Sequence, residues 1–334
     1  MLAEKAPFYA WLGDLHSWTV SRLQNLGQTF FIPDFRLGAL MIVAVAIAAP
    51  LSALAAISGA VLSRATGERL HARQDLLHAG LFEINGFFYG LAVAAFVPEP
   101  FRAVVLLGLG SMVVAALTIV CGRVLRTWNL PVLVLPYLMA MWMIFAMRVY
   151  WPVSGAAIPQ PLGLQPMGLG LQPDWLNPVW FDPLAHIAFG AVAGIGQIFY
   201  QYSPLIGLLV LAGAALIRPR AAWALFWGSA VASGVALVVG VSATDVAFGY
   251  FGYNGALLAV ALTEYRLTTP LQRVLCVATV GVVTTALGPV FARAGLSASA
   301  LPYVLLVWGF CLVGPTQTSQ LGKASSSAWV PPNY

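Results

Sequence analysis

The chain has 334 residues, of which 60% are hydrophobic and only 8% are charged, against about 45–50% and about 25% in an average soluble domain. This composition excludes an ordinary soluble protein. The net charge of +5 does not indicate a partner made of nucleic acid, because lysine occurs only at Lys5 and Lys323 and no stretch interleaves basic and aromatic residues. The sequence therefore predicts an integral membrane protein.

Long apolar runs divide the chain into two groups of six. A membrane-spanning helix needs about 20 apolar residues, and only helices or closed barrels satisfy their backbone hydrogen bonds inside lipid. Because the runs are continuous, they favour helices. The predicted runs cover 14–31, 37–49, 51–63, 78–97, 101–121 and 131–149, and then 183–200, 205–217, 221–241, 246–262, 272–291 and 300–313.

The segment between the two groups is rich in proline and glycine. Residues 151–178 contain these residues at a density that forbids a regular helix, so we expect a linker there. The predicted division is an N-terminal repeat over 1–149, an extracytoplasmic linker over 150–182, a C-terminal repeat over 183–314 and a polar C-terminal tail over 315–334.

The two groups of runs repeat each other in sequence. GQTFFIPDFRLG matches GQIFYQYSPLIG, and GLFEINGFFYGL matches GYFGYNGALLAV, both at an offset of 169 residues and without a gap. A third match pairs two Leu-Pro-Tyr segments at an offset of 166. These pairs begin at Gly27 and Gly196, at Gly80 and Gly249, and at Leu135 and Leu301. Small residues recur by chance in membrane helices, but a shared register of Gln and Asn indicates an internal duplication.

The arginines indicate how the repeats lie in the membrane, because Arg and Lys accumulate in cytoplasmic loops. If the first run of each half is re-entrant and the other five cross, each half has an odd number of spans and equivalent loops face opposite sides. Nine arginines then fall on one side and two on the other; if all six runs crossed, this division would be lost. The nine are Arg64, Arg69, Arg73, Arg123, Arg126, Arg218, Arg220, Arg266 and Arg273, and the two are Arg102 and Arg293.

The expected fold is therefore that of an all-α polytopic membrane protein built from two inverted repeats. Each repeat has five transmembrane helices and one re-entrant helix, which makes ten spans in total. Because the linker carries no Lys or Arg, we place it outside the cell and both termini in the cytoplasm.

Gln28 and Gln197 are the twinned polar residues of the first run in each half. A carboxamide in an apolar segment is unfavourable unless it is paired. Broken helices that meet near the midplane are a usual way to build a polar site in lipid. We therefore expect both amides to face a common solute, with hydrogen bonding between helices as the alternative.

Other twinned positions carry asparagine or apolar side chains. Asn85 and Asn254 each precede a glycine, and we expect them to cap backbone groups freed by a helix break rather than to contact solute. Flat apolar faces arranged as a slot would admit a planar solute and exclude hydrated ions, with core packing as the alternative. The positions concerned are Phe31 and Tyr200, Ile84 and Tyr253, and Phe88 and Leu257.

These segments together resemble the urea transporter family, whose halves each contain a GQ-to-NP-xx-G segment and a G-[LY]-[YW]-G-F-N segment. The resemblance extends from about Gly27 to Trp308 and is closer in the second half. It implies an inverted-repeat, channel-like homotrimer in the cell membrane, here a bacterial inner membrane, with a pore through each subunit. Urea would pass a slot whose oxygen atoms accept its N–H groups. By position, Gln28 and Gln197 match the polar pore residues, Phe31, Tyr200, Ile84 and Tyr253 match the slot walls, and Phe88 and Leu257 match adjacent apolar positions.

The chain departs from the family pattern at the central constriction. The family's L-P-x-x-T-x-P-F segment is LPVLVLPY in the first half and LSASALPY in the second, so Val134 and Ala300 replace both threonines. Losing a hydrogen-bond partner costs a dehydrated polar solute about 1–3 kcal/mol. Urea would therefore meet a higher central barrier here.

Glu83 is the second departure, because the second half has Gly252 at the equivalent position and the family expects glycine there. It is the only acid between Asp75 and Glu99 and lies in a run predicted to cross the membrane. An acid inside a span is a functional hypothesis by default: Glu83 would accept an N–H from the solute or stay protonated and neutral. Pairing with an arginine, or a peripheral capping role, is the alternative.

The function predicted from these observations is passive, channel-type transport of urea, with another small neutral solute (ammonia, a short amide or water) as the alternative. Paired pore histidines would favour ammonia, but none of the four histidines has a twin at offset 169. No GxxxxGK[ST] loop indicates a nucleotide, and the absence of HExxH and GxSxG disfavours an intramembrane enzyme. We expect no cofactor, no metal and no nucleic-acid partner; urea, membrane lipid and copies of the chain itself are the expected partners.

Overall fold

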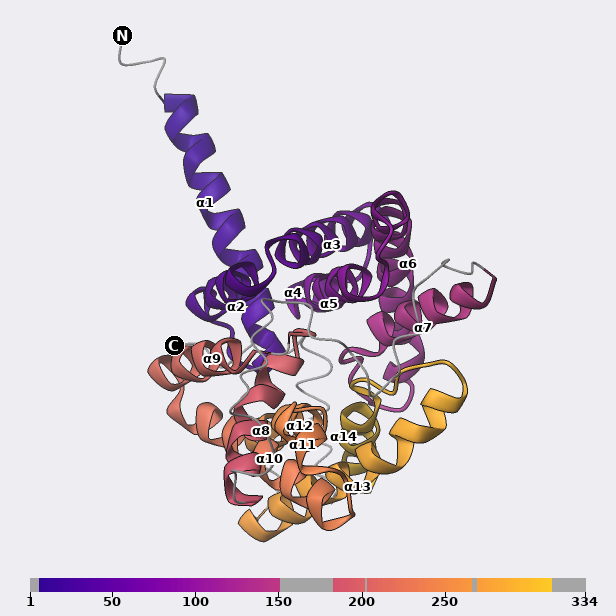
Figure 1. Ribbon diagram of the computed structural model, residues 1–334. Coiled ribbons are helices and arrows are strands. Elements are labelled where there is room, and N and C mark those ends of the chain that lie inside the picture. The colour runs from indigo at the N-terminus through magenta and orange to yellow at the C-terminus, as the bar shows by residue number, and fades with distance from the viewer. Residues whose placement is uncertain (1–5, 151–182, 202, 266–268, 314–334) are drawn as a thin grey trace.

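The computed structural model describes residues 6–150, 183–201, 203–265 and 269–313, and all regular structure in these ranges is helical (Figure 1). The first half contains α1 (Ala6–Gly27), η1 (Gln28–Phe30), α2 (Phe35–Ala48), α3 (Pro50–Arg69), α4 (Gln74–His78), α5 (Leu81–Phe96), α6 (Pro100–Arg126) and α7 (Leu135–Tyr150). The second contains α8 (Pro183–Gln197), α9 (Pro204–Ile217), α10 (Pro219–Val238), α11 (Ala243–Ala247), α12 (Gly252–Tyr265), α13 (Pro270–Arg293) and α14 (Leu301–Val313). The predicted linker from residue 151 onward and the C-terminal tail lie outside the described residues.

Several helices begin where the sequence places a proline. Proline suits the first turn of a helix because its missing N–H would have no partner there. Side-chain caps complete other helix starts: Glu99 accepts the backbone N–H groups of Phe101 and Arg102, and Thr269 forms a capping box with Gln272. The helices with proline in the first turn and a described N-cap are α3, α6, α9, α10 and α13.

Each predicted apolar run contains a helix, but two runs are broken. The run over 78–97 turns at Gly80 between α4 and α5, and the run over 246–262 turns at Gly249 between α11 and α12. Gly80 has a φ of +67° and Gly249 a φ of +80°, and residues that carry a side chain rarely adopt this backbone conformation. The runs therefore hide a turn that apolar composition alone does not reveal.

Among the described helices, three are long and apolar enough to cross a membrane: α6, α10 and α13. Residues 16–30 and helix α2 together pass the same test but are bent by 80°, as in a broken span or a re-entrant segment. The remaining apolar helices have 10–17 residues. The all-helical membrane class is thus confirmed, while the ten-span arrangement stays a prediction.

The backbone repeats in the two halves. In the described part of the chain, every residue with positive φ has a counterpart with positive φ in the other half, at one of the two offsets found in the sequence. The pairs are Phe31 and Tyr200, His71 and Gly240, Gly80 and Gly249, Asn129 and Gly295, and Leu133 and Ser299. The duplication predicted from sequence therefore extends to the conformation of the loops.

Helix packing repeats in the same way. Gly59 on α3 faces Gly86 on α5 so closely that a Cβ on Gly59 would overlap the carbonyl oxygen of Gly86. Gly228 on α10 and Gly255 on α12 make the same contact in the second half. Small residues of this kind let membrane helices approach at the backbone.

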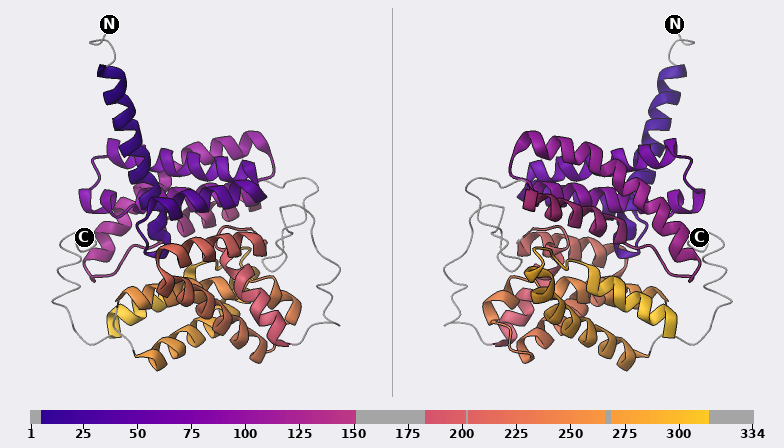
Figure 2. Two further views of the ribbon diagram at one scale, coloured as in Figure 1. Left: turned by 90° about the vertical axis from the view of Figure 1, so that its left-hand side faces the viewer. Right: turned by 90° about the vertical axis from the view of Figure 1, so that its right-hand side faces the viewer.

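The two halves form two layers that face each other (Figure 2). The equivalent helices α2 and α9 pack together at the boundary, as do α7 and α14. Mutual contact between equivalent elements is what a two-fold relation produces. One hydrophobic core crosses this boundary, where Phe199 stacks on Phe88 with ring centroids 6.3 Å apart.

Candidate functional site

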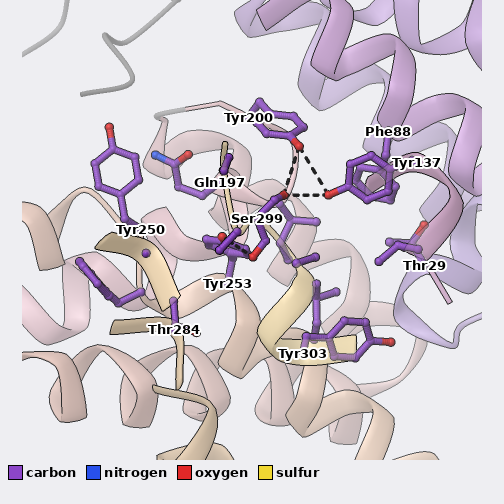
Figure 3. Close-up of a pocket in the computed structure, with 18 residues that line it drawn as sticks. Thr29, Phe88, Tyr137, Gln197, Tyr200, Tyr250, Tyr253, Thr284, Ser299 and Tyr303 are labelled. Carbon is purple, nitrogen blue, oxygen red and sulfur yellow. Dashed lines mark hydrogen bonds between the residues drawn. The ribbon is translucent and has the colours of Figure 1, made fainter. Parts of the chain in front are cut away.

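One cavity at the boundary between the halves is rich in tyrosine, and we call it the tyrosine cavity (Figure 3). It offers about 100 Å³ to water-sized molecules, enough for several waters or one small solute. Its lining residues are Thr29, Phe88, Val134, Tyr137, Gln197, Ile198, Tyr200, Tyr250, Phe251, Tyr253, Leu257, Thr284, Gly288, Ser297, Ala298, Ser299, Ala300 and Tyr303.

A second cavity, the arginine cavity, has arginine among its lining residues and offers about 260 Å³. It is lined by Gln28, Thr29, Phe31, Arg73, Asp75, Leu76, Ala79, Leu81, Ile84, Gly122, Arg126, Asn129, Leu130, Pro131, Val132, Leu133, Val134, Tyr303 and Cys311. Thr29, Val134 and Tyr303 line both cavities. The two spaces therefore adjoin at these three side chains.

Equivalent positions of the two halves line the two cavities. Gln197 in the tyrosine cavity corresponds to Gln28 in the arginine cavity, and Tyr253 corresponds to Ile84. The same relation holds for Tyr200 and Phe31, Tyr250 and Leu81, Ser299 and Leu133, and Ala300 and Val134. Equivalent segments of the two halves thus line two cavities, one on each side of the three shared residues.

Gln197 ends α8 and is positioned by a hydrogen bond. Its amide nitrogen donates to the carbonyl oxygen of Phe248 at 3.0 Å. This bond fixes which end of the carboxamide is the donor, so the carbonyl oxygen is the group that can accept from a solute in the tyrosine cavity. Gln28 lines the arginine cavity, on the other side of the shared residues.

Asn85 and Asn254 hold the two loops that lead into α7 and α14. The amide nitrogen of Asn85 donates to the carbonyl oxygen of Leu133 at 3.0 Å, and its oxygen accepts the N–H of Tyr137 at 3.1 Å. Asn254 makes the same pair of bonds, at 3.1 Å to Ser299 and 3.2 Å from Tyr303. The predicted bonding to free backbone groups is confirmed, but these groups belong to the loops before α7 and α14 and not to a helix break at the asparagines.

Three hydroxyl groups meet on the wall of the tyrosine cavity. The oxygen atoms of Tyr137 and Ser299 are 2.9 Å apart, those of Tyr200 and Ser299 are 3.2 Å apart, and those of Tyr200 and Tyr137 are 3.4 Å apart. Figure 3 shows this triangle in dashed lines. Tyr253 lies beneath it and donates to the carbonyl oxygen of Ser299 at 2.8 Å.

Glu83 lies outside both cavities, in an ion-pair cluster between α1, α3 and α5. One carboxylate oxygen accepts from Arg22 at 2.9 Å, from Arg64 at 3.2 Å and from Asn25 at 2.9 Å. The Glu83 side chain is only 3% exposed. The structure therefore places Glu83 with arginine, which is the alternative considered for it, rather than among the residues that line either cavity.

The remaining candidate residues line one cavity or the other. Gln197, Tyr200, Tyr253, Phe88, Leu257 and Ala300 line the tyrosine cavity, Gln28, Phe31 and Ile84 line the arginine cavity, and Val134 lines both. Sequence analysis missed Thr29, Tyr137, Ser299 and Tyr303. Tyr137 and Tyr303 could have been found, because they form one of the twinned pairs of the Leu-Pro-Tyr match.

The fold and cavities define a class of protein. The described residues form a helical membrane body with two adjoining cavities at the boundary of duplicated halves, and they contain no cluster of side chains that could hold a metal ion. Such an arrangement is that of a membrane transport protein.

The comparison with known families gives the particular family. Residues 19–315 match the family model described as "Urea transporter", so the chain belongs to the urea transporter family. Similar proteins include "Urea transporter 1" of Mus musculus, 24% identical over an alignment of 314 positions that covers 87% of this chain and 73% of that protein. "Urea transporter 1" of Capra hircus is 25% identical, and that of Ovis aries 24%, each over an alignment of 310 positions that covers 87% of this chain and 76% of that protein.

Proposed function

We propose that the protein carries urea passively across the membrane along a path formed by the tyrosine cavity and the arginine cavity. The observation that carries this proposal is that both cavities share Thr29, Val134 and Tyr303. A solute that passes these three side chains moves from one cavity to the other without leaving the protein. Membership of the urea transporter family supports urea as that solute.

The walls of the path suit a planar neutral molecule. Phe88 packs against Tyr137 with ring centroids 5.5 Å apart and inclined by 35°, and Leu257 lines the same cavity. An ion that loses its hydration water finds no polar group on a flat apolar surface to replace that water, whereas a small planar solute can pack against the surface. Gln197 and Gln28, one in each cavity, supply polar groups on either side.

The positions of three arginines support an inverted arrangement of the halves. Arg73 and Arg126 line the arginine cavity, and Arg218 donates to the carbonyl oxygen of Phe31, another of its lining residues, at 3.0 Å. All three belong to the nine arginines that the sequence assigns to the cytoplasmic side. We place the mouth of the arginine cavity and both termini in the cytoplasm, with ten spans arranged as two inverted repeats over 1–149 and 183–314.

Labelling of twin positions tests this orientation. Leu70 follows α3 and Val239 follows α10 at the offset of 169, and both are 53% exposed. In a variant whose three native cysteines have been replaced, we expect V239C to react with a membrane-impermeant maleimide added to intact cells. L70C should react only after lysis. Reaction of both from the same side would indicate parallel repeats.

Assembly and location follow from the family resemblance and are part of the proposal. We propose a homotrimer with a separate path through each subunit, resident in a bacterial inner membrane. Light scattering of the detergent-purified protein, corrected for bound detergent, should give three times the mass of one 35.5 kDa chain. A mass of one or two chains would contradict the trimer.

Urea flux into vesicles tests the function itself. Proteoliposomes mixed with urea in a stopped-flow instrument should re-swell faster than empty liposomes, without a proton or sodium gradient. Parallel runs with ammonia, acetamide and water separate urea from the alternative solutes. Urea flux no greater than that of empty liposomes would refute the proposed function.

A further inference from the structure

The hydroxyl triangle of Tyr137, Tyr200 and Ser299, here called the hydroxyl ring, occurs in only one of the two cavities. The offsets of 166 and 169 carry its three members to Tyr303, Phe31 and Leu133, all of which line the arginine cavity. Tyr303 keeps a hydroxyl, whereas the other two positions are apolar. The two halves therefore share a backbone but differ in chemistry at the inner wall of each cavity.

We propose that the hydroxyl ring is a solute-binding site that lies off the centre of the path and selects neutral molecules with N–H donors. This proposal rests on the proposed urea transport and names the side chains of this chain that bind the solute. It accounts for the loss of both family threonines, because it supplies hydroxyl oxygens on one side of the constriction where Val134 and Ala300 supply none.

The hydrogen-bonding capacity of the ring determines which solutes it can bind. A hydroxyl has one hydrogen and two acceptor lone pairs. Three mutual contacts use at most the three hydrogens and three of the six lone pairs, so at least three lone pairs remain. The three oxygens lie 2.9–3.4 Å from one another. The ring therefore presents several acceptors on a small wall and has its hydrogens engaged.

Neighbouring groups add to this acceptor character. The amide nitrogen of Gln197 is held by Phe248, which leaves the carbonyl oxygen of Gln197 to accept. Tyr253 and Asn254 both donate to the carbonyl oxygen of Ser299. They hold the Ser299 backbone at a φ of +42°, a conformation that is unfavourable for a residue other than glycine. These two hydrogen bonds therefore fix the backbone that carries the Ser299 hydroxyl.

The ligand class follows from this count. Urea and other primary amides carry several N–H groups in one plane and can donate to adjacent oxygens of the ring at the same time. A solute whose N–H groups are replaced by methyl groups loses these bonds. The ring carries no charge that would offset the cost of dehydrating an ion, so it favours neutral solutes, and its lone pairs repel anions.

Two variants remove one oxygen each. S299A keeps the backbone that Tyr253 and Asn254 hold, and Y200F introduces the residue that the first half already carries at Phe31. The matched control is S111A, because Ser111 is a buried serine on α6 that bonds within its own helix and lines neither cavity.

The experiment measures flux of urea and of N,N-dimethylformamide, a planar amide without N–H groups, in proteoliposomes. Removing one acceptor should raise the half-saturating urea concentration roughly five- to tenfold and lower the ratio of urea flux to dimethylformamide flux. S111A should leave both values at those of the wild type. Unchanged values in S299A and Y200F, or an equal loss for both solutes, would overturn the proposal.

A crystallographic readout does not depend on flux. Thiourea is planar, has the same N–H groups as urea and contains a sulfur atom that anomalous scattering can locate. We expect thiourea within hydrogen-bonding distance of the Ser299 hydroxyl in soaked wild-type crystals. Its absence from the ring, whether or not it binds elsewhere, overturns the proposal. Bound thiourea without urea flux would refute only the transport function, and urea flux with an empty ring would refute only this site.

Discussion

Trp142 and Trp308 donate their indole N–H groups in opposite directions across the boundary between the two halves. Trp142 donates to the carbonyl oxygen of Ser297 and Trp308 to that of Pro131, each at 2.8 Å. Each donor and each acceptor in one half lies 166 residues from its counterpart in the other. A reciprocal exchange of this kind is expected where a two-fold axis relates two surfaces, so each half holds the loop that leads into the last helix of the other.

We expect W142F and W308F each to reduce the free energy of unfolding by about 1–2 kcal/mol. Each substitution removes one hydrogen bond and leaves a part-buried carbonyl oxygen without its donor. The measurement is thermal unfolding of the detergent-purified protein, with W223F as control, because Trp223 is 63% exposed on α10. Melting temperatures equal to that of the control would mean that these bonds do not hold the halves together.

Asn85 and Asn254 should be among the least replaceable polar residues of the chain. Leucine at either position keeps the approximate volume but leaves one buried carbonyl oxygen and one buried N–H unsatisfied, at about 1–3 kcal/mol for each group. We expect N85L and N254L to unfold at lower temperature than the wild type and to conduct less urea per folded molecule, because the loops with Val134 and Ala300 lose their support. Wild-type urea flux in both variants would contradict this role.

The helices and the duplication could be predicted because both produce patterns that are visible in the sequence itself. Continuous apolar runs mark the helices, and Gln and Asn at a constant offset mark the repeat. The turns inside two of these runs were not predicted, because residues around Gly80 and Gly249 are as apolar as the helices they separate. The positive φ of Leu133 and Ser299 could not be predicted either. It is stabilised by hydrogen bonds from Asn85 and Asn254, which are distant in the sequence.

Comparing twin positions predicted ten residues that line the two cavities, but it missed the identical pair Tyr137 and Tyr303. Comparing the halves finds Gln28 with Gln197, but it passes over Thr29, whose counterpart is Ile198. It also passes over the hydroxyl ring, whose members lie 63 to 162 residues apart in the chain and meet only through the packing of one half on the other. Glu83 illustrates the same limit, because its partner Arg22 is 61 residues away.

Glu83 should matter for stability rather than for conduction. In E83Q the half-buried guanidinium groups of Arg22 and Arg64 lose the buried carboxylate that they share; breaking a fully buried pair typically costs about 3–5 kcal/mol, which sets the upper limit here. We expect a clearly lower melting temperature and an unchanged urea flux per folded molecule, because Glu83 lines neither cavity.

The matched control for this prediction is E68Q. Glu68 bonds to the same two arginines, but its side chain is 47% exposed, and exposed pairs contribute only about 0–1 kcal/mol. A drop in urea flux of E83Q with normal stability would instead place Glu83 in the transport path.

Val134 offers the most direct test of the central constriction, because it lines both cavities and differs from threonine by one hydroxyl in place of a methyl group. In V134T the new oxygen can accept an N–H from a solute that has lost its water, which is worth about 1 kcal/mol and several-fold in rate. We expect the initial urea flux to rise by that factor in V134T. The double variant with A300S should show a further increase in urea flux. V282T, on the exposed face of α13, is the control for a valine-to-threonine change elsewhere. If V134T conducts urea at the wild-type rate, the central barrier is not set by the missing threonine hydroxyl, and the hydroxyl ring already provides what the solute requires at that point.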